Sequence, residues 1–205
     1  MTRLTIAPDV FLWREKFSPI EQKKLLDQVM ARLDEAPLYR PVMPDTGKPF
    51  SVEESNFGSL GWVSDKSGYR YQPIHPVTGA AWPAIPQPLL DLWAQINTGR
   101  APECCLVNLY RSGAKMGLHQ DRDEKDASAA VIGVSLGDEA LFRIGSATRG
   151  GRTVSVTLAS GDVIAFGGGA RLAYHGIDRI RPGTSRLLAG RLSLTLRRVE
   201  RQAIS

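Results

Sequence analysis

Short strand-like runs separated by turn signals fill the second half of this 205-residue chain, and they restrict its fold more than any other feature. From Glu103 onward, runs rich in Val, Ile, Leu and Thr lie at residues 105–110, 130–136, 140–144, 153–158, 162–166 and 190–198. The turn signals between them include Ser112-Gly113, Gly150-Gly151, Ser160-Gly161 and Pro182-Gly183. Many short strands at roughly even spacing predict a mainly β fold, either a double-sheet jelly roll or a barrel.

Two helices are expected to flank these strands on the N-terminal side. Ser18-Pro19-Ile20-Glu21 has the form of a capping box with proline at the first helical position, and the apolar residues behind it recur at helical spacing. This pattern predicts an amphipathic helix over residues 19–35. Pro86-Gln87-Pro88 begins a second helix, which Gly99 ends. The region between the helices is rich in Gly, Pro and aromatic residues, which predicts loops with short strands.

Composition and length favour one domain without a membrane anchor. Hydrophobic residues make up 42% of the chain, enough for one sizeable core. No apolar run approaches about 18 residues and the N-terminus lacks a secretory signal pattern, so we expect no transmembrane helix and a cytoplasmic location. The adjacent Cys104 and Cys105 are typical of buried thiols in a reducing compartment. The net charge of +5 suits a polyanionic partner but does not require one.

The triplet His119-Gln120-Asp121 and the later His175 form a candidate metal site. On an extended strand, residues two positions apart point to the same face, so His119 and Asp121 would point together. Two imidazoles and one carboxylate are the ligand set of non-haem Fe(II) oxygenases. Two simpler interpretations stay open from the residues alone: a chance triplet, and a strand-end histidine with its polar tip in water.

The segment from Arg191 to Arg197 alternates strictly between two kinds of side chain. Leu192, Leu194 and Leu196 share one face of the expected strand, and the other face carries Arg191, Ser193, Thr195 and Arg197. If the polar face points into the mouth of the jelly roll, its guanidinium groups can bind a carboxylate through paired hydrogen bonds. The alternative is an amphipathic strand with a solvated outer face.

Taken in order, these segments resemble the AlkB family of Fe(II)/2-oxoglutarate-dependent dioxygenases, which repair alkylated nucleic acid. The resemblance spans about residues 38–198 and rests on Leu60-Gly61-Trp62, Gly68-Tyr69-Arg70-Tyr71, Trp82-Pro83-Ala84-Ile85-Pro86, Asn108-Leu109-Tyr110, Gly113-Ala114-Lys115, Leu118-His119-Gln120-Asp121-Arg122-Asp123-Glu124, Tyr174-His175-Gly176 and the strand 191–197. It implies that iron is bound by His119, Asp121 and His175.

The resemblance also implies which residues hold the co-substrate. Arg191 would pair with the distal carboxylate of 2-oxoglutarate, assisted by the hydroxyl of Tyr110. Asn108 and Arg197 would lie at the end that chelates iron. Ser193 stands where the family often carries Asn. Because a serine hydroxyl is shorter than a carboxamide, we expect a bridging water or a slightly weaker hold on 2-oxoglutarate.

The substrate residues implied by the resemblance lie mainly in the aromatic region. Trp62 would cover a flipped base opposite the ring of His119, and Tyr69 would lie near the nucleic-acid backbone. Asp123 would bind the exocyclic amine of the base. Glu54 stands in a lid strand where a relative carries an apolar residue, and a carboxylate there would favour the cationic bases 1-methyladenine and 3-methylcytosine. The alternative for Glu54 is a solvated strand residue.

The resulting prediction is a single domain, 1–205, of mainly β class with flanking helices. It comprises an N-terminal helical extension (1–37), a nucleotide-recognition lid (38–85) and a double-stranded β-helix, or jelly-roll, core (86–205). The implied reaction uses Fe(II), 2-oxoglutarate and O₂ to demethylate bases in single-stranded or duplex DNA, or in RNA, and releases formaldehyde, succinate and CO₂. We expect a monomer. The alternatives are a hydroxylase of a small molecule or protein side chain, and a non-enzymatic nucleic-acid binder.

Overall fold

Strands dominate the computed structural model, which describes residues 2–97 and 99–201. In chain order the elements are β1 (Arg3–Ala7), β2 (Val10–Trp13), α1 (Pro19–Glu35), β3 (Glu53–Gly58), β4 (Gly61–Asp65), β5 (Gly68–Gln72), α2 (Gln87–Ile96), β6 (Cys104–Tyr110), β7 (Met116–His119), β8 (Val131–Gly137), β9 (Glu139–Ile144), β10 (Val154–Leu158), β11 (Val163–Phe166), the short 3₁₀ helix η1 (Gly168–Ala170), β12 (His175–Arg181) and β13 (Arg191–Arg197). Both predicted helices and all the predicted strand runs after residue 103 are present, which confirms the mainly β prediction.

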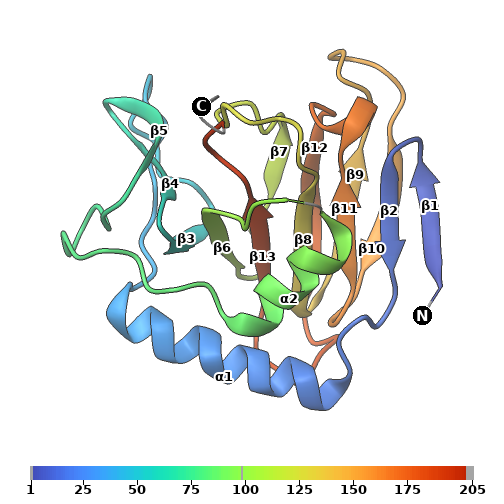
Figure 1. Ribbon diagram of the computed structural model, residues 1–205, viewed down its shortest axis with the longest axis horizontal. Helices are drawn as coiled ribbons and strands as arrows, with labels where there is room; N and C mark the ends of the chain where they lie inside the picture. Colours follow the sequence, from blue (N-terminus) through green and yellow to red (C-terminus); the bar gives the residue numbers. More distant parts are fainter. Residues whose placement is uncertain (1, 98, 202–205) are drawn as a thin grey trace.

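Two antiparallel sheets form the jelly-roll core, as predicted. The larger sheet has the strand order β1-β2-β11-β8-β13-β6-β3, and the smaller one β10-β9-β12-β7. The hairpin β4–β5 is a separate two-stranded sheet, and Figure 1 shows it standing apart from the strands of the core. It belongs to the aromatic region between the helices, so the chain carries a small projecting structure beside one end of the core.

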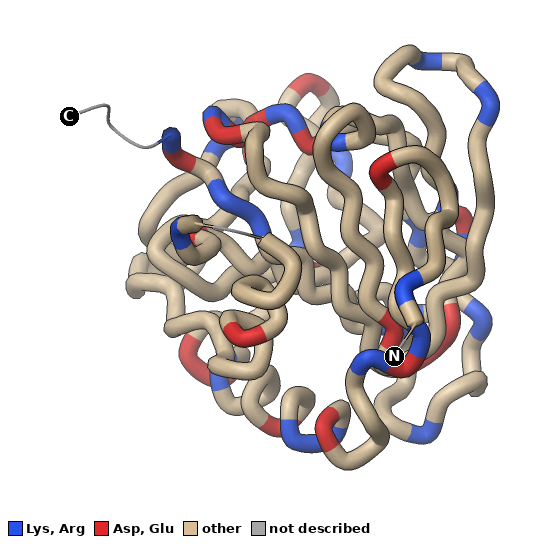
Figure 2. Tube along the Cα trace, turned by 45° about the vertical axis from the view of Figure 1, so that its right-hand side comes forward, with Lys and Arg blue, Asp and Glu red and all other residues tan. Residues whose placement is uncertain are grey.

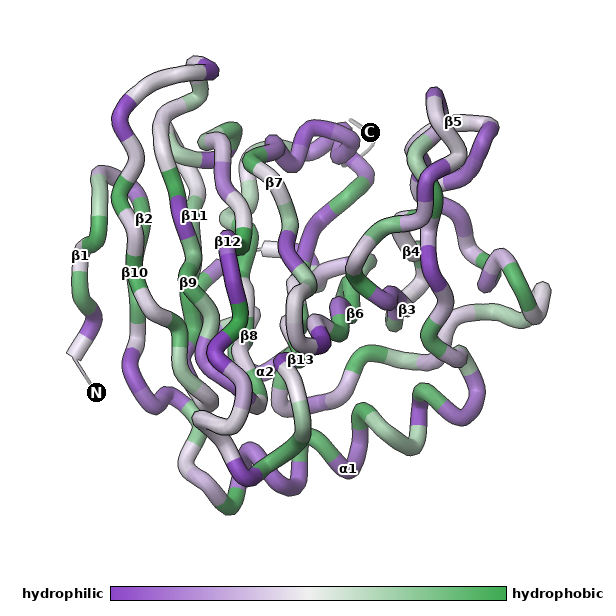
Figure 3. The backbone as a smooth tube through the Cα atoms, turned by 180° about the vertical axis from the view of Figure 1, so that it is seen from behind, coloured by the Kyte–Doolittle hydropathy of each residue, from purple (hydrophilic) through white to green (hydrophobic). Residues whose placement is uncertain are grey.

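Helix α1 begins at the predicted capping box. The Ser18 hydroxyl accepts a hydrogen bond from the Glu21 backbone N–H at 3.4 Å, and the Glu21 carboxylate accepts one from the Ser18 N–H at 2.7 Å. Hydrophilic and hydrophobic residues alternate along the helix (Figure 3), although Ile20 and Met30 are exposed and the buried stripe is narrower than the sequence pattern. Neither helix of the described chain is long and apolar enough to cross a membrane.

The core has two layers, one on each side of the large sheet. One layer packs α1 and α2 against the outer face of this sheet, and its members include Leu192, Leu194 and Leu196. The other layer fills the space between the two sheets. Each buried leucine contributes about 1.5–3 kcal/mol, and a one-residue slip of β13 would exchange its two faces. The leucines therefore hold Arg191, Ser193 and Arg197 on the inner face.

The N-terminal segment contains strands that the sequence patterns do not predict. Residues 1–37 were expected to supply a helix, yet β1 and β2 form a hairpin and β2 pairs with β11, so this segment extends the large sheet. Strand β1 is mostly exposed, and the burial of its side chains does not alternate from one residue to the next. Strand β12 also lies outside the predicted runs, and it pairs with β7 and β9 in the small sheet.

Candidate active site

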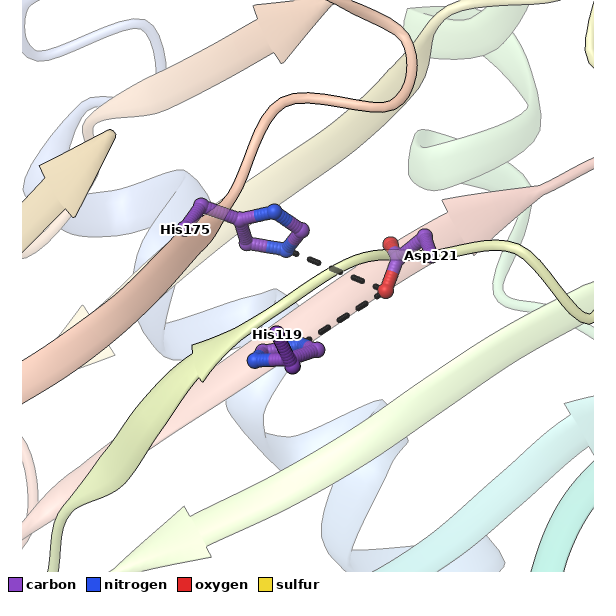
Figure 4. Close-up of side chains that lie close together, drawn as sticks. All are labelled: His119, Asp121 and His175. Atoms are coloured by element: carbon purple, nitrogen blue, oxygen red, sulfur yellow. Dashed lines mark ion pairs between the residues drawn. The ribbon is translucent and has the colours of Figure 1, made fainter. Parts of the chain in front are cut away.

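The three candidate metal ligands come together at the end of the small sheet. His119 is the last residue of β7 and His175 is the first of β12, and the two residues face each other in the antiparallel register. Their Nε2 atoms lie 3.6 and 3.8 Å from Oδ1 of Asp121 (Figure 4). Asp121 follows the end of β7 instead of lying on the strand, but its side chain still turns toward both rings. Asp121 and His175 are buried, which rules out the water-exposed interpretation.

Hydrogen bonds to backbone carbonyls orient both imidazole rings. Nδ1 of His119 lies 3.0 Å from the carbonyl oxygen of Gly117, and Nδ1 of His175 lies 2.9 Å from that of Ala173. A carbonyl only accepts, so each Nδ1 carries the proton and each Nε2 offers its lone pair toward Asp121. Burial lowers the pKa of His175 to about 4, which keeps this imidazole neutral and able to bind a metal.

Two buried arginines hold Asp121 in place. Nε and Nη2 of Arg197 lie 3.0 and 2.8 Å from Oδ2 of Asp121, which leaves Oδ1 facing the imidazoles. Nη1 of Arg171 donates to the Asp121 backbone carbonyl at 2.7 Å. Burial alone would raise the pKa of Asp121, but Arg197 and the histidines hold it well below its usual range. The site therefore presents one carboxylate oxygen and two imidazole nitrogens, a donor set that suits a transition metal.

A buried ion pair behind Asp121 was not predicted from the sequence. Nη2 of Arg171 lies 3.1 Å from the Glu124 carboxylate, and both side chains are almost fully buried. Glu124 also accepts a hydrogen bond from the hydroxyl of Tyr71 on β5. Glu124 and Tyr71 lie within the motifs that carry the family resemblance, whereas Arg171 lies outside them, and no local sequence pattern pairs residues so far apart in the chain. This network connects the β4–β5 hairpin to the metal site.

Arg191 is buried in the same cavity with an incomplete set of partners. Its Nη2 donates to the Ser135 hydroxyl at 2.9 Å, whereas Nε and Nη1 have no hydrogen-bond partner among the described residues. Its guanidinium carbon lies 5.4 Å from the centre of the Tyr110 ring. Burial lowers the pKa of Arg191 because it disfavours the charged guanidinium. An anionic ligand would stabilise that charged form. These unpaired N–H groups on a buried cation can be satisfied by an anionic ligand such as a carboxylate.

Asn108 and Ser193 lie directly opposite each other on β6 and β13. Both are buried, and the Asn108 side-chain oxygen has no hydrogen-bond partner within the described chain. These two polar groups, together with Arg191 and Tyr110, line the inner part of the cavity. They suit a small polar ligand with a carboxylate at one end.

The aromatic residues of the hairpin cover the mouth of the cavity. The rings of Trp62 on β4 and Tyr69 on β5 are stacked, with centres 5.5 Å apart and planes inclined by 16°. The indole N–H of Trp62 donates to the Asp123 carboxylate at 2.8 Å, which joins the hairpin to the segment after β7. The sequence motifs indicate these residues but not that they contact one another.

Glu54 faces the same cavity from β3. It is 1% exposed, and neither carboxylate oxygen has a partner among the residues that the structure describes. Burial raises the pKa of Glu54 to about 8. The interpretation of Glu54 as a solvated strand residue is therefore wrong.

One cavity of about 890 Å³ connects the metal ligands, the polar groups around Arg191 and the aromatic residues of the hairpin. Its lining includes every site residue predicted from the sequence: Glu54, Trp62, Tyr69, Asn108, Tyr110, His119, Asp121, Asp123, His175, Arg191, Ser193 and Arg197. Exposed basic side chains also border it, namely Lys48, Lys115, Arg122 and Arg149. Lys and Arg are distributed along the whole trace (Figure 2), so the position of these four, more than the net charge, favours a polyanion at the cavity.

Comparison with known proteins identifies the class to which this site belongs. The family model of the 2OG-Fe(II) oxygenase superfamily matches residues 5–197, so the chain belongs to this superfamily and is an Fe(II)/2-oxoglutarate-dependent dioxygenase. It is 50% identical over 200 residues to the alpha-ketoglutarate-dependent dioxygenase AlkB homolog of Caulobacter vibrioides, covering 95% of this chain and 90% of the relative. Within the superfamily, the chain belongs to the AlkB family.

Two further similarities support the same assignment. The alpha-ketoglutarate-dependent dioxygenase AlkB of Escherichia coli strain K12 is 38% identical over 182 residues, which cover 86% of this chain and 83% of the relative. The solved structure of OsALKBH1 superposes with a TM-score of 0.84 at 30% identity, and covers 96% of this chain and 100% of that chain. The predicted jelly-roll fold and the predicted use of Fe(II), 2-oxoglutarate and O₂ are confirmed.

Proposed function

We propose that this dioxygenase demethylates alkylated bases in DNA or RNA, with 1-methyladenine and 3-methylcytosine as typical substrates. The main support is the arrangement of a single cavity. A metal-binding triad with two buried members, Asp121 and His175, and a partly unpaired Arg191 lie inside it, and stacked aromatic rings and basic side chains lie at its mouth. Membership of the AlkB family supports a nucleic-acid substrate.

His119, Asp121 and His175 are the residues that would hold Fe(II), and Arg191 is the residue that would bind the distal carboxylate of 2-oxoglutarate. With Fe(II), 2-oxoglutarate and O₂ bound, the site would couple decarboxylation of the co-substrate to succinate and CO₂ with hydroxylation of an N-methyl group, which leaves as formaldehyde. Arg197 keeps one oxygen of Asp121 directed at the imidazoles. Asn108, Tyr110 and Ser193 limit how the co-substrate can lie.

The target base would occupy the space between the ring of Trp62 and that of His119. Tyr69 stacks on Trp62, and Asp123 Oδ2 accepts the indole N–H of Trp62. The carboxylate of Asp123 would accept a further hydrogen bond from an exocyclic amino group of the base. A methyl group on the Watson–Crick edge is inaccessible in a duplex, so the base must be single-stranded or flipped out. The alkylated base pairs poorly, which lowers the cost of flipping.

The test is a single-turnover experiment. Protein is loaded anaerobically with Fe(II) and 2-oxoglutarate, O₂ is admitted, and succinate and formaldehyde are measured over a panel of methylated and unmethylated DNA and RNA oligonucleotides, single-stranded and duplex. Formaldehyde released in proportion to succinate, and only with methylated oligonucleotides, is the expected result. Succinate that does not depend on the oligonucleotide would indicate the alternative, a hydroxylase of another substrate. No succinate at all would indicate a non-enzymatic binder.

Three finer predictions remain with this proposal. The division into an extension, a lid and a core at residues 37 and 85 can be tested by limited proteolysis. The monomeric state can be tested by light scattering, with and without an oligonucleotide. The cytoplasmic location stays a prediction until the protein is fractionated from cells.

A further inference from the structure

Glu54 belongs to a row of three polar side chains that crosses the floor of the cavity. It lies opposite Asn108 in the pairing of β3 with β6, and Asn108 lies opposite Ser193 in the pairing of β6 with β13. Directly opposite residues in antiparallel strands place their side chains on the same face. The adjacent Glu53 therefore points to the other face, where its carboxylate pairs with Arg111 at 2.9 Å and with Arg40 at 3.5 Å.

The carboxyl group of Glu54 is almost fully buried, and within the described chain it has no hydrogen-bond partner. The groups that face it electrostatically are Arg197, Tyr39 and Tyr110. Arg197 is already paired with Asp121. Its attraction lowers the pKa of Glu54 less than the burial of Glu54 raises it. An unpaired buried carboxyl raises the free energy of the folded protein. A ligand that supplies positive charge or N–H donors would therefore gain binding free energy by pairing with it.

The position of Glu54 favours the base over the co-substrate as this ligand. Strand β6 separates β3 from β13, which carries Arg191 and Ser193, and two strand spacings amount to roughly 10 Å. A carboxylate beside the carboxylates of 2-oxoglutarate would also be repelled by them. In the other direction, β3 is followed within three residues by β4, which carries Trp62. Glu54 thus lies on the side of the cavity that the hairpin covers.

We propose that Glu54 is a specificity-determining residue of the base pocket, and that its carboxylate pairs with the positive charge of a cationic N-methylated base. This inference rests on the proposed function, because it assumes that an alkylated base enters the cavity. 3-Methylcytosine and 1-methyladenine carry such a charge, whereas 3-methylthymine and the unmodified bases are neutral. A cation beside the carboxyl favours its ionised form, so Glu54 releases its proton when the base binds.

The experiment compares two pyrimidine lesions that carry the methyl group on the same ring nitrogen. Single-stranded oligonucleotides of identical sequence contain either 3-methylcytosine or 3-methylthymine. Binding is measured by fluorescence anisotropy without O₂ and with Mn(II) and 2-oxoglutarate, and kcat/KM is measured with Fe(II) and O₂. Glu54→Gln removes the charge with little change in shape and should reduce the preference for 3-methylcytosine about tenfold in both measurements, the difference between a charge-assisted and a neutral hydrogen bond. Glu53→Gln, on the opposite face of β3, should leave the preference unchanged.

The outcomes separate this inference from the proposed function. An unchanged preference in Glu54→Gln, with both lesions still repaired, overturns the role of Glu54 and leaves demethylation standing. Equal losses on both lesions with a raised KM for 2-oxoglutarate assign Glu54 to the co-substrate and also overturn it. Wild-type protein that turns over neither lesion contradicts the proposed function, and wild-type protein that binds the two lesions equally contradicts the inference even where turnover is absent.

Discussion

Replacing Glu54 by Gln should stabilise the metal-free protein, and the gain should grow with pH. The pKa of Glu54 is raised from 4.5 to about 8 by burial, so the folded protein retains a proton that the unfolded chain releases. The stability associated with this group is therefore fully present below pH 4.5 and is lost as the pH rises toward 8. Each pKa unit corresponds to about 1.4 kcal/mol, so the carboxyl costs about 3 kcal/mol at pH 7 and about 1 kcal/mol at pH 5.

The assay is urea unfolding of wild type and Glu54→Gln at pH 5, 6, 7 and 8, with a chelator present to remove metal. The difference in the free energy of unfolding should increase by about 2 kcal/mol between pH 5 and pH 7. Glu53→Gln is the matched control, and it should lose a little stability because it breaks the pairs with Arg40 and Arg111. A difference between Glu54→Gln and wild type that does not change with pH would refute the reasoning.

Three further substitutions test the two ends of the cavity. Arg191→Lys should weaken 2-oxoglutarate binding about 10- to 100-fold in calorimetric titration, because an ammonium cannot replace a planar pair of N–H donors; metal affinity should not change. Trp62→Ala should raise the KM for a methylated oligonucleotide about tenfold or more through lost stacking, while the affinity for 2-oxoglutarate in the same calorimetric titration stays constant, and an unchanged KM would exclude a stacking role. Ser193→Asn should tighten 2-oxoglutarate binding because the longer side chain reaches the co-substrate directly, and equal affinity in the same titration would contradict this.

Local sequence patterns were sufficient for much of the fold and for the residue types of the site. The capping box located the start of α1, and the short apolar runs after residue 103 located the later strands of the core except β7 and β12. The strict alternation from Arg191 to Arg197 separated a leucine face from a polar face. These features depend on near neighbours in the chain, because helical and strand periodicities are properties of a few consecutive residues. Strand periodicity also predicted that His119 and Asp121 point together, which holds although Asp121 lies just beyond the end of β7.

Other features depended on contacts between distant segments, which no local pattern encodes. The hairpin β1–β2 extends the large sheet because β2 pairs with the edge of β11. Arg171 forms an ion pair with Glu124, which lies 47 positions away in the chain. Glu54 shows the difference most clearly. Its sequence neighbours are compatible with an ordinary exposed strand, but its placement between β6 and the hairpin removes it from water and provides no partner. Burial depends on how the whole molecule packs, so the sequence around Glu54 does not reveal it. The burial of an unpaired carboxyl is what makes Glu54 a candidate specificity residue for cationic bases.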